Sequence, residues 1–404
     1  MQGLDWLSLF VRWFHVIAGV AWIGASFYFI WLDNSLRTPP EWKQKKGIKG
    51  DLWAIHGGGF YEVAKYAYGP ETMPTTLHWF KWEAYTTWLS GFALLIIVYY
   101  FGASAYLIDP SVNALTPLSA ILSGLGVIFG GLAIYELACR SPLAKSPKAF
   151  AIFLITLLCF TSWLTSTLFS GRGAYIHVGA LVGTIMVANV FLNIMPNQRK
   201  MVAAVANKGD IDPAWGASAK LRSVHNNYLT LPLLFIMISN HYPMTYQHPQ
   251  NWLVLIAIMA LSAWIRHFFN LKHQHVKKPS ILITGAIGML LLAIWVSMPV
   301  AAPSAEATAD EDKKESSATV RTDADNEVAA LVEKHCTSCH ASEPTDDIFK
   351  VAPLGVKFDN WADIKRYAPQ IYQRAAVTKD MPFLNKTGMT EEERQAIASW
   401  YQQR

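Results

Sequence analysis

Hydrophobic residues along this chain gather into long continuous stretches that are separated by polar connections. Eight stretches are long and apolar enough to cross a bilayer core of about 30 Å as α-helices. These predicted spans are residues 6–32, 79–101, 116–138, 149–169, 174–195, 222–241, 250–270 and 279–300. The pattern therefore predicts an all-α fold whose first 300 residues form an eight-transmembrane-helix bundle.

The pattern changes after the last apolar stretch. Residues 301–324 are small, charged and free of aromatic side chains, which is typical of a flexible linker. Residues 325–404 then show the mixed polar and apolar pattern of a second, compact domain. The chain is thus predicted to have a transmembrane domain (1–300), a linker (301–324) and a small all-α domain (325–404).

Composition agrees with a location in the lipid bilayer. Only 16% of the 404 residues are charged, whereas soluble domains carry about 25%. The 16 Trp and 16 Tyr residues suit the aromatic belts at membrane interfaces. The net charge is +5 and the basic residues lie in separate short stretches, which argues against nucleic-acid binding.

Lys and Arg alternate between successive connections. The connections rich in these residues are 33–78, 139–148, 196–221 and 271–278. The connections between them are 102–115 and 242–249, which have none, and 170–173, which has only Arg172. The positive-inside rule places the basic connections in the cytoplasm. The N-terminus and the C-terminal domain are therefore predicted on the opposite side of the membrane.

The C-terminal domain carries the stretch "EKHCTSCHASEP". Two cysteines two residues apart, with a histidine directly after the second, form the attachment sequence of a c-type haem. Cys336 and Cys339 would supply the thioethers, and His340 an axial imidazole ligand. Cytochromes c often take methionine as the sixth ligand; we expect Met381, in "KDMPFL", and read Met389 as packing. Zinc is the alternative, but zinc needs four suitably spaced ligands.

Two helices are predicted to enclose this motif. Thr390 and Glu393 can form a capping box, and the following residues Ile397, Trp400 and Tyr401 fall on one apolar face. This face would pack against the helix "NEVAALVEKHC", as in small cytochromes c. Bacteria attach c-type haem outside the cytoplasm. The cytochrome c domain is therefore predicted on the periplasmic side of a bacterial inner (cell) membrane, in agreement with the charge pattern.

Polar residues inside apolar spans are costly and usually functional. His15 lies in "FVRWFHVIAGVAWIGASFYF" and His177 in "GRGAYIHVGALVG", each near glycines and at a similar depth. These two histidines could form a bis-imidazole site for haem b. The alternative for each is a buried histidine that is hydrogen-bonded to a neighbouring helix.

A second polar set lies toward the cytoplasmic ends of three spans. It occupies the stretches "LHWFKWEAYTTW", "RSVHNNYLTLP" and "WIRHFFNLKH", and could form one polar pocket. Snorkelling of long side chains to the interface is the alternative. The residues that we select as candidate catalytic groups are His78, Lys81, Glu83, His225 and Asn226.

The stretches "WFHVIAGVAWIGASFYFIWLDNSL", "HGGGFYEV" and "HWFKWEAYTTWLSGF", together with the cytochrome tail, are similar to the bacterial membrane-bound urate oxidases, or PuuD-type urate hydroxylases. The resemblance spans the whole chain. It implies oxidation of urate to 5-hydroxyisourate in purine breakdown. It also implies that electrons leave through the haem c to a soluble cytochrome c or terminal oxidase, without forming hydrogen peroxide.

The polar set has side chains suited to a planar urate anion, which needs a cation, edge-reading amides and a base. The candidate cations are Lys81, Arg222 and Arg266. The candidate amides are Asn226, Asn227 and Asn270, and the candidate bases are His78, His225 and Glu83. A cytoplasmic pocket lies far from a periplasmic haem, so either a haem b relays electrons or urate binds nearer the outer side.

Two other functions use the same residues. The chain could be a quinol-oxidising electron-transfer subunit with b haems and a cytochrome c output. It could also be a membrane haem-assembly or transport protein with a redox tail. Intramembrane histidines suit both alternatives, and the whole-chain resemblance favours urate oxidation.

Overall fold

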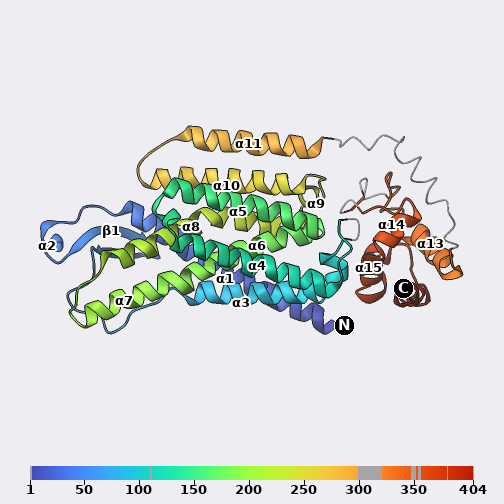
Figure 1. The fold of residues 1–404 in the computed structure, drawn as a ribbon, viewed down its shortest axis with the longest axis horizontal. Helices are drawn as coiled ribbons and strands as arrows, with labels where there is room; N and C mark the ends of the chain where they lie inside the picture. The colour runs from blue at the N-terminus through green and yellow to red at the C-terminus, as the bar shows by residue number, and fades with distance from the viewer. Residues whose placement is uncertain are drawn as a thin grey trace.

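The computed structural model describes residues 2–109, 112–298, 321–346, 352–353, 356–379 and 381–403. The chain is mostly helical, and a long bundle is followed by a small tail domain at one of its ends (Figure 1). The bundle helices are α1 (Gln2–Ser35), α3 (Trp82–Leu94), α4 (Pro117–Arg140), α5 (Pro147–Leu168), α6 (Gly171–Ala188), α7 (Met195–Ala206), α8 (Pro213–Ile238), α10 (Asn251–His273) and α11 (Pro279–Ser297). Short elements between them are α2 (Glu41–Gln44), α9 (Pro243–Tyr246), and the 3₁₀ or π turns η1 (Leu95–Tyr100), η2 (Ala103–Leu107), η3 (Pro142–Lys145), η4 (Asn189–Ile194) and η5 (Ser239–His241).

Six helical segments of the described chain are long and apolar enough to cross a membrane. They are Trp6–Ser35, Pro117–Arg140, Pro147–Leu168, Gly171–Ala206, Asn251–His273 and Pro279–Ser297. Each coincides with a predicted span, and Gly171–Ala206 is one continuous run through α6, η4 and α7. A multi-pass membrane protein is compatible with these six helices.

The two remaining predicted spans, 79–101 and 222–241, are also largely helical but are not among the six. The first begins in α3, whose regular turns last 13 residues before the chain continues as the π-helix η1. The second runs from within α8 through η5, and α8 contains Pro232 and buries several polar side chains. The count of eight membrane spans therefore stays a prediction.

The expectation of a purely α-helical chain is wrong for the connection 33–78. Strands β1 (Ile48–His56) and β2 (Gly59–Tyr66) pair there as an antiparallel hairpin. Gly57 and Gly58 form its turn with φ of +58° and +82°, a backbone region in which glycine has no steric cost. The "HGGG" stretch is thus explained by turn geometry.

Two ends of the bundle can be told apart in Figure 1. The N-terminal end of α1 lies at the same end as the tail domain, which we call the tail end. The hairpin and α7 lie at the opposite, hairpin end. Helix α6 forms the centre, where most of its side chains are buried against α4, α5 and α8. The basic connections 33–78 and 196–221 are therefore remote from the tail domain, in the arrangement that the charge pattern predicts.

The tail domain contains α13 (Asp323–His335), α14 (Trp361–Arg366), α15 (Ala368–Ile371), η7 (Tyr372–Val377), η8 (Phe383–Asn385) and α16 (Glu391–Gln402). Most of the predicted linker 301–324 lies outside the described residues. The predicted capping box at Thr390 and Glu393 is confirmed. Helices α13 and α16 pack together, and the Trp400 indole donates a 2.8 Å hydrogen bond to Asp325. Met389 is buried in this core, so its assignment to packing is confirmed.

We expect Glu393 to make the tail domain sensitive to acid. Its carboxylate accepts hydrogen bonds from Lys334 and from the Thr390 backbone, which lower the pKa of Glu393 to about 2. The folded pKa is thus below the unfolded value, so the stabilisation is complete above about pH 4.5 and is lost as the pH falls toward 2. Glu393→Gln should flatten this dependence.

The measurement is urea-dependent amide protection of α13 and α16 in the full chain, corrected for intrinsic exchange at each pH. Glu327→Gln, at an exposed position on α13, is the matched control and should keep the wild-type profile. An unchanged acid dependence in Glu393→Gln contradicts the prediction.

Candidate functional site

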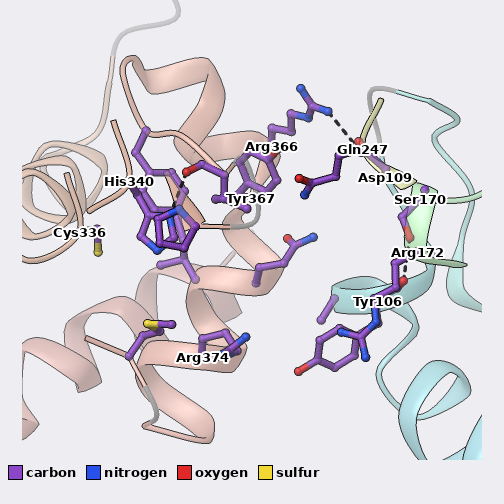
Figure 2. A pocket seen from close by; sticks show the side chains of 18 of the residues that line it. Tyr106, Asp109, Ser170, Arg172, Gln247, Cys336, His340, Arg366, Tyr367 and Arg374 are labelled. Atoms are coloured by element: carbon purple, nitrogen blue, oxygen red, sulfur yellow. Dashed lines mark hydrogen bonds and ion pairs between the residues drawn. The ribbon is translucent and has the colours of Figure 1, made fainter. Parts of the chain in front are cut away.

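A cavity of about 940 Å³ lies between the tail domain and the tail end of the bundle. Cys336, Cys339, His340 and Met381 all line it. The structure therefore brings together the four residues that the sequence assigns to a c-type haem. Figure 2 shows His340 and Cys336 on the tail side of this space, facing residues of the bundle across it.

The surroundings of His340 suit an axial ligand. Its Nδ1–H donates a 2.9 Å hydrogen bond to the carbonyl oxygen of Val356, which leaves the Nε2 lone pair for a metal. The ring of Phe358 lies 5.3 Å from the imidazole, and Tyr367 extends the apolar wall. Such an apolar crevice with a few polar groups is typical of a cofactor site.

The two cysteines form no disulfide with each other and line this crevice. Burial raises the pKa of Cys336 to about 12 and also raises the pKa of Cys339. Within the described ranges, no group of three or more His, Cys, Asp or Glu side chains could hold a metal ion by itself. The zinc alternative therefore gains no support, whereas the residues present fit a covalently attached haem.

Arg394, on α16, holds the segment that carries Met381. The buried guanidinium donates from Nη1 to the backbone oxygens of Met381, at 2.8 Å, and Ala375. Its Nη2 donates to Asn385 at 3.3 Å. Sequence reasoning missed this residue, although a charged residue on the apolar face of α16 was the available signal.

The opposite wall of the cavity belongs to the bundle. It includes Tyr106, Arg172 and Gln247. At its edge Asp109 forms an ion pair of 3.3 Å with Arg366 of the tail domain. Helix α15 also packs against η2, so the two units share a defined boundary.

A buried polar network lies nearer the hairpin end. Arg222, on α8, pairs with both carboxylate oxygens of Glu136, on α4, at 2.8 and 3.0 Å. The same guanidinium donates to Asn189 at 2.7 Å, and Asn189 donates to Asn226 at 2.8 Å. We refer to these four residues as the Arg222 network. Sequence reasoning missed Glu136 and Asn189, although each is a polar residue inside an apolar span.

His225 borders this network and a cavity of about 270 Å³ that Arg222 and Glu136 also line. Its Nδ1 lies 2.7 Å from the Tyr135 hydroxyl, and its ring stacks on Phe150 with centroids 4.6 Å apart. The structure thus brings together two of the predicted catalytic residues, His225 and Asn226, through the Arg222 network.

A second polar cluster lies against α8, α10 and α1. The Nε of Arg266 donates to Asn227, and Asn227 donates to Asn270 at 2.9 Å. The Arg266 guanidinium lies 4.1 Å from the centre of the Phe27 ring. Arg266 is 5% exposed. Among the residues that the structure describes, no carboxylate lies within ion-pair distance of it.

The other predicted catalytic residues lie at the start of α3. His78 is exposed, and its Nε2 lies 3.8 Å from the Glu83 carboxylate. Lys81 precedes the helix, with its ammonium 5.8 Å from the Trp82 ring. In the described part of the chain, no hydrogen bond or ion pair joins this group to the Arg222 network.

His15 and His177 are each bonded within their own surroundings. His15 Nδ1 lies 3.0 Å from both the Thr87 carbonyl and the Ser90 hydroxyl. His177 is fully buried, and its Nδ1 donates to the Gly173 carbonyl at 2.8 Å. Neither histidine lines the two cavities described above. The proposed haem b pairing stays a prediction.

These features define a multi-helix protein with membrane-type helices and buried polar clusters, joined to a small helical domain whose crevice is lined by Cys336, Cys339 and His340. Residues 2–297 match the family described as Urate oxidase N-terminal, and the chain belongs to this family. The predicted family resemblance is thereby confirmed for the bundle. No curated protein and no solved structure matches the chain.

We expect Glu136 to be essential for the stability of the bundle. Glu136→Leu leaves Arg222 as a buried charge without its carboxylate, and such a loss typically costs about 3–5 kcal/mol. The double variant Glu136→Leu/Arg222→Met removes both charges and should recover most of the lost stability.

The measurement is thermal unfolding of the full chain in one detergent. A single variant as stable as the wild type, or a double variant no better than the single one, contradicts this account of the ion pair.

Proposed function

We propose that this protein oxidises urate to 5-hydroxyisourate at the membrane and passes the electrons out through a c-type haem on its tail domain. The observation that carries the proposal is a crevice suited to a haem in a chain that belongs to the urate oxidase N-terminal family. The same chain has a buried arginine, Arg266, that can bind an anion. The reaction adds the oxygen of one water to urate and releases two electrons and two protons.

Charge balance distinguishes the two buried arginines near the hairpin end. The charge of Arg222 is already balanced by Glu136, whereas no carboxylate of the described residues lies within ion-pair distance of Arg266, which contacts Asn227 and Phe27. A buried cation without a counter-charge is costly. An anionic ligand would supply that counter-charge, so we assign the urate anion to Arg266, with Asn227 and Asn270 as edge-reading amides.

Proton transfer requires a group that can accept a proton as the electrons leave. His225 is our candidate to take up the proton through water, because it lies on the side of α8 opposite Asn227 and its ring borders a cavity that can admit water. Its Nδ1 is engaged by the Tyr135 hydroxyl. Asn226 would hold the network beside it. We assign no proton-transfer role to the three candidates at the start of α3, His78, Lys81 and Glu83, because no described hydrogen bond or ion pair joins them to the Arg222 network.

The electrons must then travel along the bundle. Asn251, which lines the tail cavity, and Arg266, at the proposed urate site, are 15 residues apart on α10, which corresponds to about 22 Å along the helix. One direct transfer over such a distance is slow. A relay is therefore part of the proposal, and His15 and His177 are its candidate haem b ligands.

The haem c would be held by thioether bonds to Cys336 and Cys339, and its iron by His340 and Met381. It would supply one-electron chemistry, so each urate requires two successive transfers. Arg394 keeps the Met381 segment in place through its hydrogen bonds. A soluble cytochrome c or terminal oxidase is the proposed acceptor, on the periplasmic side of a bacterial inner membrane.

The first test is anaerobic addition of urate to membranes that contain the protein. We expect prompt appearance of the reduced c-haem absorption band, because no oxygen is available to take the electrons. The band should be absent in Cys336→Ala/Cys339→Ala, which cannot attach haem. If a quinol reduces the haem and urate does not, the chain is an electron-transfer subunit of the quinol-oxidising kind.

The second test concerns the urate anion. Hydrogen bonds to charged groups contribute about 1.5–3 kcal/mol, so Arg266→Gln should lower kcat/KM for urate by about 10- to 100-fold, mainly through KM. Arg266→Lys keeps the charge and should lose less. An unchanged KM in Arg266→Gln would move the urate site to the cavity beside His225.

A further inference from the structure

We propose that Arg172, in the bundle, binds the carboxylate groups of the haem carried by the tail domain. The bundle would then form one wall of the haem pocket. The inference rests on the proposed function, since it presumes a covalent haem at Cys336 and Cys339. It adds a residue from outside the cytochrome domain to the cofactor site.

Arg172 faces the same cavity as the haem-binding residues of the tail (Figure 2). Its Nε donates to the Tyr99 hydroxyl at 2.9 Å and to Asn240 at 3.2 Å. The guanidinium carbon lies 5.4 and 5.2 Å from the ring centres of Tyr99 and Tyr106. These neighbours fix the guanidinium in position but carry no compensating negative charge at neutral pH.

The two Nη groups of Arg172 are left for a ligand. Among the described residues, neither group has a hydrogen-bond partner and no carboxylate lies within ion-pair distance of the guanidinium. Arg172 also stands in the first turn of the 18-residue helix α6, where the helix dipole is positive. The charge of the guanidinium and the positive end of the helix dipole both favour an anion at this wall of the cavity.

The protein's own carboxylates do not fill this role. The acidic residues among the described lining of the cavity are Asp109 and Asp346. Asp109 pairs with Arg366, and Asp346 pairs with Lys386 at 2.8 Å. Each already has a cationic partner. The uncompensated cation therefore matches a ligand with its own carboxylates, and the haem that the tail cysteines would carry has two.

The boundary between the units also holds the tail in a suitable place. The ion pair of Asp109 with Arg366 and the packing of α15 on η2 fix the crevice against the end of the bundle. Removal of Asp109 should loosen this boundary without touching the residues that hold the haem. This separation allows contact across the boundary to be tested apart from folding.

The experiment is a potentiometric titration of the c-haem band in the purified full chain. A cation beside the haem carboxylates favours the ferrous state, so Arg172→Gln should raise the ferric-to-ferrous ratio at a fixed potential. We expect a change of about three- to tenfold, tenfold being 59 mV for one electron. Arg172→Lys should keep most of the wild-type ratio, and Arg199→Gln, at an exposed position on α7, should keep all of it.

A double variant separates direct contact from a structural effect. In Asp109→Lys the new positive charge repels Arg366, so the tail should move off the bundle. Adding Arg172→Gln in this background should then no longer change the ferric-to-ferrous ratio. A wild-type ratio in Arg172→Gln, or an equal change in both backgrounds, overturns the inference. Failure of the tail to bind haem covalently, seen as loss of the band on denaturing gels, instead overturns the proposed function.

Discussion

The ion pair between Arg222 and Glu136 is the interaction on which the hairpin end of the bundle depends. An isolated charge in an apolar interior is strongly unfavourable, so neither residue is tolerated there without the other. Their pairing fixes α8 against α4, and through Asn189 it also fixes η4, which continues α6. This frame holds His225 and Asn226 beside a cavity. Because α8 is held in this orientation, Asn227 lies on the opposite side of the helix, toward α10.

In both units, hydrogen bonds and ion pairs to buried arginines determine how the surrounding segments are held. In the tail domain, Arg394 satisfies two backbone oxygens and thereby holds the Met381 segment. In the bundle, Arg266 near the hairpin end and Arg172 at the tail end each lack a carboxylate partner among the described residues. Both uncompensated cations lie where the proposed reaction requires an anion, the substrate in one place and the cofactor in the other.

Sequence predicted the features that depend on neighbouring residues. The apolar stretches located the long helices, and the spacing of Cys336, Cys339 and His340 located the crevice. The capping box of Thr390 and Glu393 was likewise local. The hairpin was missed because its strands lie in a polar connection and its turn signal was read as part of a loop.

Features that depend on partners distant in the chain were harder to predict. Asn189 and Glu136 were visible as polar residues inside spans, but nothing in the sequence pairs them with Arg222. The sequence also placed His78 and His225 at a similar depth in the membrane, on the basis of their positions in the predicted spans alone. The structure connects only His225 to the network, because depth does not specify which helices are neighbours.

The continuous helical run Gly171–Ala206 has a mechanical consequence. Its 36 residues correspond to about 54 Å, well beyond the bilayer core. The run carries Arg172 near one end and Asn189 at its middle, and it ends in α7. It therefore acts as a rod that connects the tail cavity with the Arg222 network. The π-helical turn at Asn189–Ile194 lies within this rod, beside the Arg222 network. A displacement along the axis would therefore move the tail cavity and the inner network together.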